Sequence, residues 1–465
     1  MTYPKTPSPE ALPPAASLNG AGHSDDSRAR ELPAIAPSSV VPPSDVPPSD
    51  VPLSDVPLSD VPLSDVPLSD VSPSGLRPGS SAGLPSGLRL VSPSGLRPGS
   101  PSGLPLSGQP EQGPDAAELT PRTSERLLIE LIPDMLEAGP IATVNCGSLG
   151  RGQLAKAFAL AAPTADVSVN FLDLHAMRLA QASVAGNRPR FHCEPDDPAA
   201  EGTLDCAALP LSAGGDAEWT LDRLQAAYVA LRVGGRLWAA TDNPRDRWLR
   251  GELEKLFGRI KTRTFSDGIV YHAIKTKALK KIKDRVCWFA FRDGDRLLRV
   301  ASRPGVFSHR HLDTGARCLM ETMELTPGMR VFEPGCGAGP VACAAAARAP
   351  DVHVLAIDSN PRAVQCTRWS AAANGLAGVS VMLNADGDCD TPGSYDLALA
   401  NPPYYSHGQI SRLFIDGARR ALRPDGIPLA VTKDPGWYIE ELPRDFTDVE
   451  VLAVRAYYVL RARRR

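Results

Sequence analysis

From about Thr120 onward, short apolar runs alternate with helix-forming stretches, and this series occurs twice along the chain. The first series contains the runs IATVNCG, VSVNFLD and GRLWAATD, and the second contains MRVFEPG, VHVLAID and YDLALANPP. Strands that alternate with helices predict a parallel sheet with helices on both faces. The sequence therefore predicts an α/β fold made of two units of similar size in tandem.

The residues before this point have a different composition. Residues 41–70 consist of pentapeptides of the form V-P-P/L-S-D, and VSPSGLRPGS occurs at 71–80 and again at 91–100. A proline every few residues prevents a helix, and regularly spaced aspartates oppose collapse. We therefore expect three regions: a disordered, Pro/Ser/Asp-rich low-complexity tail over 1–120, a first α/β domain with a basic linker over 121–285, and a second α/β domain over 286–465.

Charge and cysteine usage limit the classes of partner and compartment. The formal net charge is −3, but the tail holds 13 acidic and 6 basic residues, so the rest of the chain is mildly basic. That balance permits nucleic-acid binding without requiring it. Nine cysteines occur without a C-x-x-C pair, which favours reduced thiols over a zinc or redox motif, and no metal site is expected. No run reaches transmembrane length or resembles a signal peptide, so we expect a cytoplasmic monomer.

A glycine-rich junction, V-F-E-P-G-C-G-A-G-P, joins a predicted strand to a predicted helix in the second series. It contains Glu333, Gly335, Gly337 and Gly339. Glycines at such a junction let backbone N–H groups and the start of the helix approach a ligand closely. G-x-G-x-G alone is shared by nucleotide and nicotinamide sites, but the pyrophosphate turn of a dinucleotide dehydrogenase needs its third glycine at Pro340.

Acidic residues follow the next two strands. Asp358 ends the strand VHVLAID, and Asp386 follows the third strand in LNADGD. A carboxylate at the end of the second strand can accept hydrogen bonds from both ribose hydroxyls of a nucleoside. Asp386 is placed to meet an adenine amino group. The alternative is that Glu333 and Asp358 only cap the helices that follow them.

The fourth strand of the second series ends in L-A-L-A-N-P-P-Y-Y. Asn401, Pro402, Pro403 and Tyr404 then lie at the carboxyl edge of the sheet, where ligands of parallel sheets bind. The Asn401 side-chain oxygen and the Pro402 carbonyl can accept the hydrogens of a planar amine and so orient its nitrogen. The prolines fix the backbone, and Tyr404 can stack on a base. An isolated tetrapeptide of this kind would more simply be a proline-rich turn.

The acid, the spaced glycines and the second acid together resemble the class I methyltransferase fold, which binds S-adenosylmethionine. In that family the first acid and the glycines hold the methionine part of the cofactor, and the second acid holds the ribose. The resemblance implies cofactor contacts from Glu333, Gly335, Cys336, Gly337, Gly339, Asp358, Ser359, Asp386 and Asn401, and catalytic roles for Asn401, Pro402, Pro403 and Tyr404.

The segment before the glycine junction, R-P-G-V-F-S-H-R-H-L-D-T-G-A-R-C-L (from Arg303), narrows the resemblance. It is similar to a segment of the bacterial ribosomal RNA guanine-N2 methyltransferases of the RsmC/RlmG type, which also have tandem methyltransferase-like domains. This implies methyl transfer to a guanine N2 amine in ribosomal RNA. Residues implied to lie near the donor or the target base are Pro304, Gly305, Phe307, Ser308, Asp313 and Gly315.

Other activities share the N-P-P-Y tetrapeptide. Adenine-N6 methyltransferases and glutamine-N5 methyltransferases of release factors carry similar residues, so both remain alternatives. A third alternative is an RNA-binding ribosome-assembly factor that keeps the fold without the activity. The intact Asn401 and the glycines favour an enzyme.

The first series lacks these site residues. It has V-N-C-G-S-L-G-R-G-Q at the corresponding junction, so that Asn145 replaces the acid and the glycines are irregularly spaced. Asp173 is a candidate for the ribose acid, and no N-P-P sequence follows. We expect this unit to position RNA or to support folding.

Basic runs suggest RNA contacts. Lys275–Arg285 carries six basic residues, and the chain ends in R-A-R-R-R. Such runs are often only solvated surface, but on an RNA enzyme Lys280, Lys281 and Lys283 are candidate phosphate contacts. Trp437 follows where the family has a short asparagine-containing turn. It is a candidate for stacking on RNA, or else a tryptophan at the edge of the core.

Overall fold

A computed structural model describes residues 89–91, 120–184, 186, 188–403 and 408–465. All of these lie in one compact body, Val46–Arg465, and the two α/β series within it are called the first unit and the second unit. Most of the tail that was predicted to be disordered lies outside the described residues. Within it, Arg89–Val91 form a short strand, β1, that pairs parallel with the strand Phe446–Val454. The repetitive composition gave no signal for this pairing.

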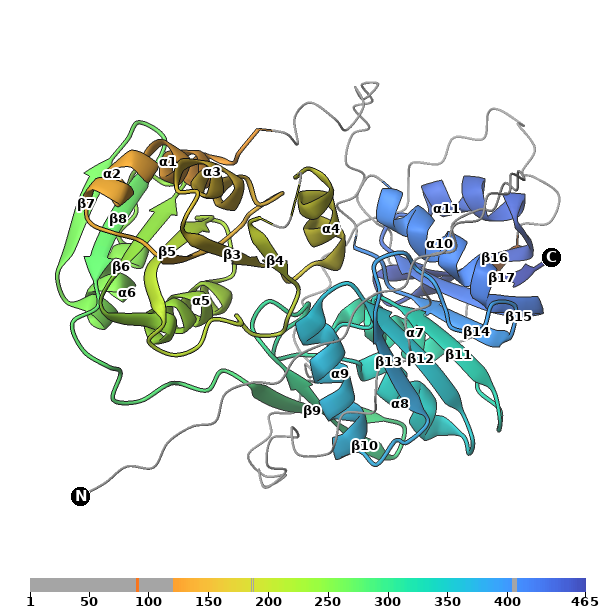
Figure 1. Ribbon diagram of the computed structural model, residues 1–465. Coiled ribbons are helices and arrows are strands. Elements are labelled where there is room, and N and C mark those ends of the chain that lie inside the picture. The colour runs from red at the N-terminus through yellow and green to blue at the C-terminus, as the bar shows by residue number, and fades with distance from the viewer. Residues whose placement is uncertain (1–88, 92–119, 185, 187, 404–407) are drawn as a thin grey trace, which may run out of the picture. The chain divides into compact units, whose positions relative to one another are not determined.

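The first predicted series forms a seven-stranded sheet in the order β4-β3-β2-β5-β6-β8-β7 (Figure 1). Its elements are α1 (Thr123–Glu130), α2 (Ile132–Glu137), β2 (Thr143–Cys146), α3 (Gln153–Ala161), β3 (Asp166–Asn170), α4 (Leu174–Ala182), β4 (Arg190–His192), β5 (Leu204–Leu211), α5 (Ala217–Ala230), β6 (Leu231–Thr241), α6 (Trp248–Phe257), β7 (Ile260–Thr264) and β8 (Ile269–Ile274).

The second series forms an eight-stranded sheet in the order β1-β16-β17-β15-β14-β11-β12-β13. Its elements are α7 (Thr314–Thr322), β11 (Arg330–Pro334), α8 (Pro340–Arg348), β12 (His353–Asp358), α9 (Pro361–Ala373), β13 (Val379–Leu383), β14 (Tyr395–Ala400), α10 (Gln409–Ala421), β15 (Leu422–Thr432), α11 (Gly436–Glu441), the 3-10 turn η4 (Leu442–Arg444), β16 (Phe446–Val454) and β17 (Tyr457–Arg464).

The two sheets have the same topology once β1 is set aside. When the strands of each series are numbered from its own first strand, both sheets read 3-2-1-4-5-7-6. The first five strands of each are parallel, and the last strand of each inserts antiparallel next to the fifth. The prediction of two tandem, seven-stranded, Rossmann-like α/β domains is therefore confirmed.

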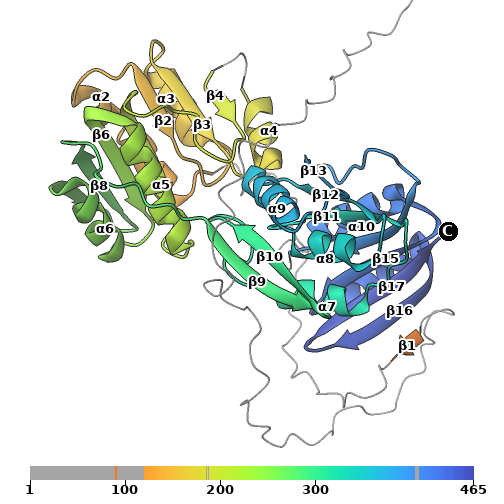
Figure 2. The same ribbon diagram turned by 90° about the horizontal axis from the view of Figure 1, so that it is seen from below.

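Alternation along the central strands explains why helices cover both faces of the second sheet. Val331 and Leu397 pack into a core with α7, α8 and α9, whereas their neighbours Phe332 and Ala398 pack into a core with α10 and α11 (Figures 1 and 2). Successive side chains of a strand point to opposite faces, so a strand buried on both sides must be apolar throughout. The parallel register brings the carboxyl ends of β11, β12 and β14 to one edge, where the predicted site residues lie.

A hairpin that the sequence reading did not predict connects the two sheets. Its strands are β9 (Cys287–Asp293) and β10 (Arg296–Ser302), and they pair antiparallel. The hairpin docks on α9 (Figure 2): the Ala301 N–H donates to Ser370 Oγ at 3.0 Å, and the Arg299 N–H donates to Asn374 Oδ1 at 3.0 Å.

No helix among the described residues has the length and hydropathy needed to cross a membrane.

Candidate functional site

The glycine turn after β11 adopts backbone conformations that favour glycine. Gly335, Gly337 and Gly339 have φ angles of 72°, 57° and 83°. A Cβ on Gly335 would lie 2.6 Å from the Phe414 ring, and one on Gly339 would lie 2.7 Å from Thr367, whereas a Cβ on Gly337 would meet open space. The outer glycines therefore allow close packing of the turn, and Gly337 faces the side from which a ligand can approach.

Asp358 lies at the end of the neighbouring strand, β12, and contacts the glycine turn. Its Oδ2 accepts the Gly337 N–H at 2.9 Å, and its Oδ1 accepts the Asn360 N–H at 2.8 Å. Burial raises the pKa of Asp358 to about 6, although these backbone hydrogen bonds favour the ionised form. Asn360 in turn caps α9, which begins at Pro361. The alternative role of Asp358 as the helix cap is therefore taken by Asn360.

Glu333 lies on β11, the strand next to β12, and one oxygen of its carboxyl group lacks a hydrogen-bond partner in the described part of the chain. Its side chain is buried, and its Oε2 has no hydrogen-bond partner among the described residues. Burial raises its pKa well above the usual range, and the nearby Asp358 adds to the shift. The group also has a backbone hydrogen bond with Ala342 of α8, so it partly fulfils the alternative role of a helix cap. A buried carboxyl oxygen without a donor is costly for the free protein, which indicates a ligand that supplies the missing donor.

Asn401 stands at the end of β14 with its amide fixed by a neighbour. Its Nδ2 donates to Asp313 Oδ2 at 2.8 Å, and the same carboxylate oxygen caps α7 by accepting the Ala316 N–H at 2.9 Å. Because a carboxylate only accepts hydrogen bonds, this contact places the Asn401 Oδ1 on the opposite side of the amide. A Cβ at Gly315 would lie 2.8 Å from that oxygen, so only glycine leaves it room.

The glycine turn and the Asn401 amide line one hollow. It is bounded by Glu333, Gly335, Cys336, Gly337, Ala338, Pro340 and Val341 on the turn and α8 side, and by Phe289, Phe307, Ser308, His311, Asp313, Ala316 and Asn401 on the other. Phe307 is 65% exposed at its rim. The structure thus brings both groups of sequence-predicted residues to one place, although they are separated along the chain.

Other predicted residues lie at the margins of this arrangement. Asp386 is exposed, and its Oδ2 pairs with Arg178 of α4 at 2.6 Å. Ser359 accepts the Leu174 N–H at 2.9 Å through its carbonyl, so its backbone also contacts α4. Pro402 is buried and Pro403 half-buried. Tyr404 lies outside the described residues.

The candidate RNA contacts differ in exposure. Lys280, Lys281 and Lys283 are exposed on the segment that follows β8. Lys275 of the same basic run is buried, and its Nζ donates to the Leu231 carbonyl at 2.6 Å, so it is not available to a phosphate. Trp437 is half-buried, with Arg412 5.2 Å from its ring centre and Tyr438 packed edge-on. This packing favours the alternative of a tryptophan at the core edge.

The corresponding edge of the first sheet is built differently. Asn145 stands where the second sheet has Glu333, and its Nδ2 donates to Ser168 Oγ at 3.2 Å. A Cβ on Gly147 would lie 2.1 Å from the Arg223 guanidinium, which therefore occupies the space beside this turn. Burial lowers the pKa of Arg223 to about 10. Asp173, the candidate ribose acid, caps α4 by accepting the His175 and Ala176 N–H groups.

Sequence reasoning missed a set of residues between the sheets. Arg362, four residues after Asp358, is 4% exposed and pairs through Nη1 with Asp222 of α5 at 2.7 Å. Arg310 pairs with Glu218, also of α5. Each is a single charged residue without a motif, so no local pattern could have identified it.

Comparison with known proteins finds a family model that matches the region of the second sheet. Residues 297–461 match the family described as methyltransferase small domain. Ribosomal RNA small subunit methyltransferase C of Pseudomonas entomophila is 38% identical over 137 residues, which are 30% of this chain and 40% of that protein. Ribosomal RNA large subunit methyltransferase G of Streptomyces coelicolor is 36% identical over 185 residues, or 37% and 49%. The matched region thus spans less than half of either relative.

A solved structure extends the likeness to both sheets. The T. thermophilus 16S rRNA N2 G1207 methyltransferase (RsmC), in complex with AdoMet and guanosine, has a TM-score of 0.60 and covers 73% of this chain and 92% of its own. It is 24% identical, so this likeness shows the fold. Together with the shared strand order, these matches confirm the resemblance recognised from the sequence: the chain has the class I methyltransferase fold, it is similar to proteins of the RsmC/RlmG type, and residues 297–461 match the methyltransferase small domain.

Proposed function

We propose that this protein is a cytoplasmic enzyme that transfers a methyl group from S-adenosylmethionine to the exocyclic N2 amine of a guanine in ribosomal RNA. The observation that carries the proposal is the Asn401 amide. Its nitrogen is held by Asp313 at 2.8 Å, so that its oxygen is available as an acceptor at the hollow that Glu333 and Gly337 also line.

The residues of the glycine turn fit the cofactor. The unsatisfied Glu333 Oε2 is an acceptor for the cofactor's ammonium group, and the open side of Gly337 lets the backbone approach it. Asp358 presents a carboxylate that can accept the ribose hydroxyls. Asp386 can bind the adenine of the cofactor only if its ion pair with Arg178 breaks. When bound, S-adenosylmethionine supplies an electrophilic methyl group on a sulfonium sulfur.

The amine side of the site acts by positioning. An exocyclic amine is a weak nucleophile because its lone pair is delocalised into the base, so its orientation decides the rate. Asn401 Oδ1 and the Pro402 carbonyl accept its two hydrogens and direct the nitrogen toward the methyl group. Asp313 fixes which face of the Asn401 amide is presented, and the exposed Phe307 ring offers a surface on which the base can stack.

The preference for guanine in ribosomal RNA draws on the relatives. The P-G-V-F-S segment resembles one found in ribosomal RNA guanine-N2 methyltransferases, and the two relatives are named for different ribosomal subunits. The exposed Lys280, Lys281 and Lys283 supply candidate phosphate contacts. We propose ribosomal RNA or a ribosomal subunit as the partner, bound by a monomer.

Methylation of isolated subunits tests the proposal. Small and large ribosomal subunits from cells that lack this protein are incubated with the purified chain and radiolabelled S-adenosylmethionine, and the RNA is digested to nucleosides. Label in N2-methylguanosine is the expected result. Label in N6-methyladenosine would support adenine methylation instead. Labelled protein without labelled RNA would indicate glutamine methylation, and no transfer to any substrate would favour a binding role.

A further inference from the structure

The loop 303–313 connects β10 to α7 and carries much of the amine side of the proposed site, including Phe307 and Asp313. Its backbone is unusual because two residues other than glycine have positive φ angles, Ser308 at 54° and Arg310 at 77°. Such conformations cost free energy and persist only where the surroundings determine them. The contacts that hold this loop therefore decide how the proposed site is shaped.

One holding contact comes from the first unit. Arg310 donates from Nε and Nη2 to the two carboxylate oxygens of Glu218, at 2.8 and 2.9 Å, which is a bidentate pair. The Nε2 atom of His309 lies 3.0 Å from the same carboxylate. A bidentate pair fixes direction as well as distance. Glu218 thus meets two consecutive loop residues, immediately beside Ser308.

A second contact is steric and lies at the beginning of the loop. Gly305 has a φ of 85°, and a Cβ there would lie 3.0 Å from Leu172 and 3.4 Å from Trp219, both of the first unit. The glycine of the P-G-V-F-S segment therefore permits close packing against α5. Its carbonyl also accepts the Asn360 side-chain N–H at 2.8 Å, which connects the loop to the cap of α9.

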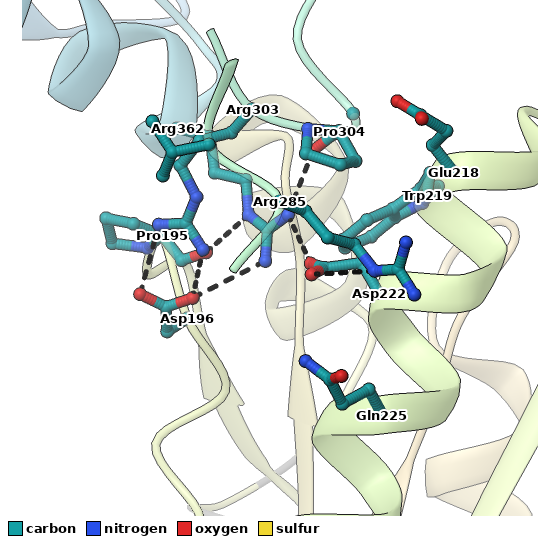
Figure 3. Close-up of polar contacts among 12 residues, drawn as sticks. Pro195, Asp196, Glu218, Trp219, Asp222, Gln225, Arg285, Arg303, Pro304 and Arg362 are labelled. Atoms are coloured by element: carbon teal, nitrogen blue, oxygen red, sulfur yellow. Dashed lines mark hydrogen bonds and ion pairs between the residues drawn. The ribbon is translucent and has the colours of Figure 1, made fainter. Parts of the chain in front are cut away.

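The third contact is the buried guanidinium of Arg362. It donates through Nη1 to Asp222 at 2.7 Å and to the Pro304 carbonyl at 2.9 Å, and it lies 4.6 Å from the centre of the Trp219 ring (Figure 3). Glu218, Trp219 and Asp222 lie about one turn apart on α5, so one region of this helix contacts the beginning of the loop, partly through Arg362, and its middle at His309 and Arg310.

We propose that this turn of α5 sets the conformation of the loop 303–313, and that Glu218 is a positioning residue for the amine-binding side of the site. The inference rests on the proposed function, because the loop matters for catalysis only if the amine binds there. It gives the first unit, whose own cofactor edge carries Asn145 and Arg223, a defined part in the reaction of the second unit.

The test compares Glu218→Gln with Glu254→Gln in the full-length protein. Glu254 forms an ion pair with Arg250 at 2.9 Å within α6 of the same unit, so its variant removes a matched charge away from the loop. Steady-state transfer is measured with ribosomal subunits from cells that lack this protein, and S-adenosylhomocysteine affinity is measured by calorimetry. Hydrogen exchange of peptides from 303–313 reports the loop directly, without activity.

We expect Glu218→Gln to lower kcat/KM for the subunit on the order of tenfold, because small displacements of positioning groups are costly. Its affinity for S-adenosylhomocysteine should stay that of the wild type, loop amides should exchange faster, and Glu254→Gln should match the wild type in all three. The double variant Glu218→Arg with Arg310→Glu should recover part of the rate that Glu218→Arg loses.

Two results would overturn the inference. One is unchanged loop exchange together with unchanged kcat/KM in Glu218→Gln. The other is a Glu218→Gln variant in which cofactor affinity and thermal stability both fall along with kcat/KM. That result would make Glu218 a general structural contact. A wild-type protein that labels neither subunit would instead refute the proposed function, and the exchange measurement would then show only whether Glu218 fixes the loop.

Discussion

The two sheets of this protein share a strand order but differ at the edge where ligands of such sheets bind. In the second sheet this edge carries Glu333 with an unsatisfied oxygen, Gly337 beside open space and Asn401 with a fixed amide. In the first sheet a hydrogen-bonded asparagine, Asn145, replaces the acid, and the Arg223 guanidinium fills the space beside the turn.

The difference teaches that the fold and the site are separable. A strand order depends on many apolar residues, each of which tolerates exchange, so both sheets keep it. A site depends on a few polar residues that are individually costly to the free protein, so it is lost wherever nothing requires it. In the first unit, the charged residues of α5 contact the second unit instead.

The largest effect is expected at the proposed amine site. Asn401→Ala removes the acceptor that orients the amine, so we expect kcat to fall by on the order of 10²–10³, the loss typical of removing one such contact to a transition state. Calorimetry should show that S-adenosylhomocysteine still binds. Asn145→Ala, at the corresponding edge of the first sheet, should leave kcat unchanged. A fully active Asn401→Ala variant would remove the functional distinction between the sheets.

The contact between the units is tested by its buried ion pair. Asp222→Ala leaves the Arg362 guanidinium, which is 4% exposed, without its near partner. We expect the free energy of unfolding to fall by about 3 kcal/mol, because the buried guanidinium then keeps only the exposed Asp196, at 3.5 Å, as an ionic partner. Glu254→Ala removes an exposed pair and should cost no more than about 0.5 kcal/mol. Chemical denaturation measures both, and equal losses would show that the contact contributes no more than a surface pair.

Glu333→Gln should raise the stability of the free protein and lower its affinity for the cofactor. Burial raises the folded-state pKa of Glu333 well above the ordinary glutamate value, so the stability that this group contributes at low pH is lost as pH rises toward the raised pKa. The neutral glutamine should raise the free energy of unfolding by about 1–3 kcal/mol, the cost of an unsatisfied buried group, while cofactor affinity falls. Thermal unfolding with and without S-adenosylhomocysteine measures both changes. A variant that loses stability without ligand would contradict this assignment.

The pKa of Asp358 predicts a pH dependence that the first sheet should not share. Because this pKa is raised to about 6, its carboxyl becomes protonated as pH falls through that value and can no longer accept both ribose hydroxyls. Cofactor affinity should therefore fall about tenfold per pH unit below the pKa. The free protein, in contrast, gains stability from this group as pH falls through 6. Asp358→Asn should bind weakly with no such pH profile, and a persistent profile would assign the titration to another group.

The smallest effect is expected on the exposed basic segment. Replacement of Lys280, Lys281 and Lys283 by alanine should weaken RNA binding and reduce the salt dependence of the affinity, since each phosphate contact releases about one counterion. Filter binding over a range of salt concentrations measures the slope. An unchanged slope would show that these lysines are only solvated surface.

Much of the fold and the centre of the candidate site could be predicted from the sequence. The alternation of apolar runs predicted both sheets, and the spacing of Glu333, the glycines, Asp358 and Asn401 predicted that they meet at one edge, because parallel strands bring their carboxyl ends together. The hairpin β9–β10 and the strand β1 were not predicted, since neither lies within an alternating series.

The sequence by itself determined the succession of strands and helices along the chain and the chemistry of the glycine turn, because periodicity and motif spacing are local properties of the chain. Only the tertiary structure decided that Arg223 fills the first turn, that Asp386 pairs with Arg178, and that Glu218 and Asp222 meet Arg310 and Arg362. These contacts join residues far apart in the sequence through charge complementarity. Any one arginine could pair with many acids, and only the packing of the folded chain selects which.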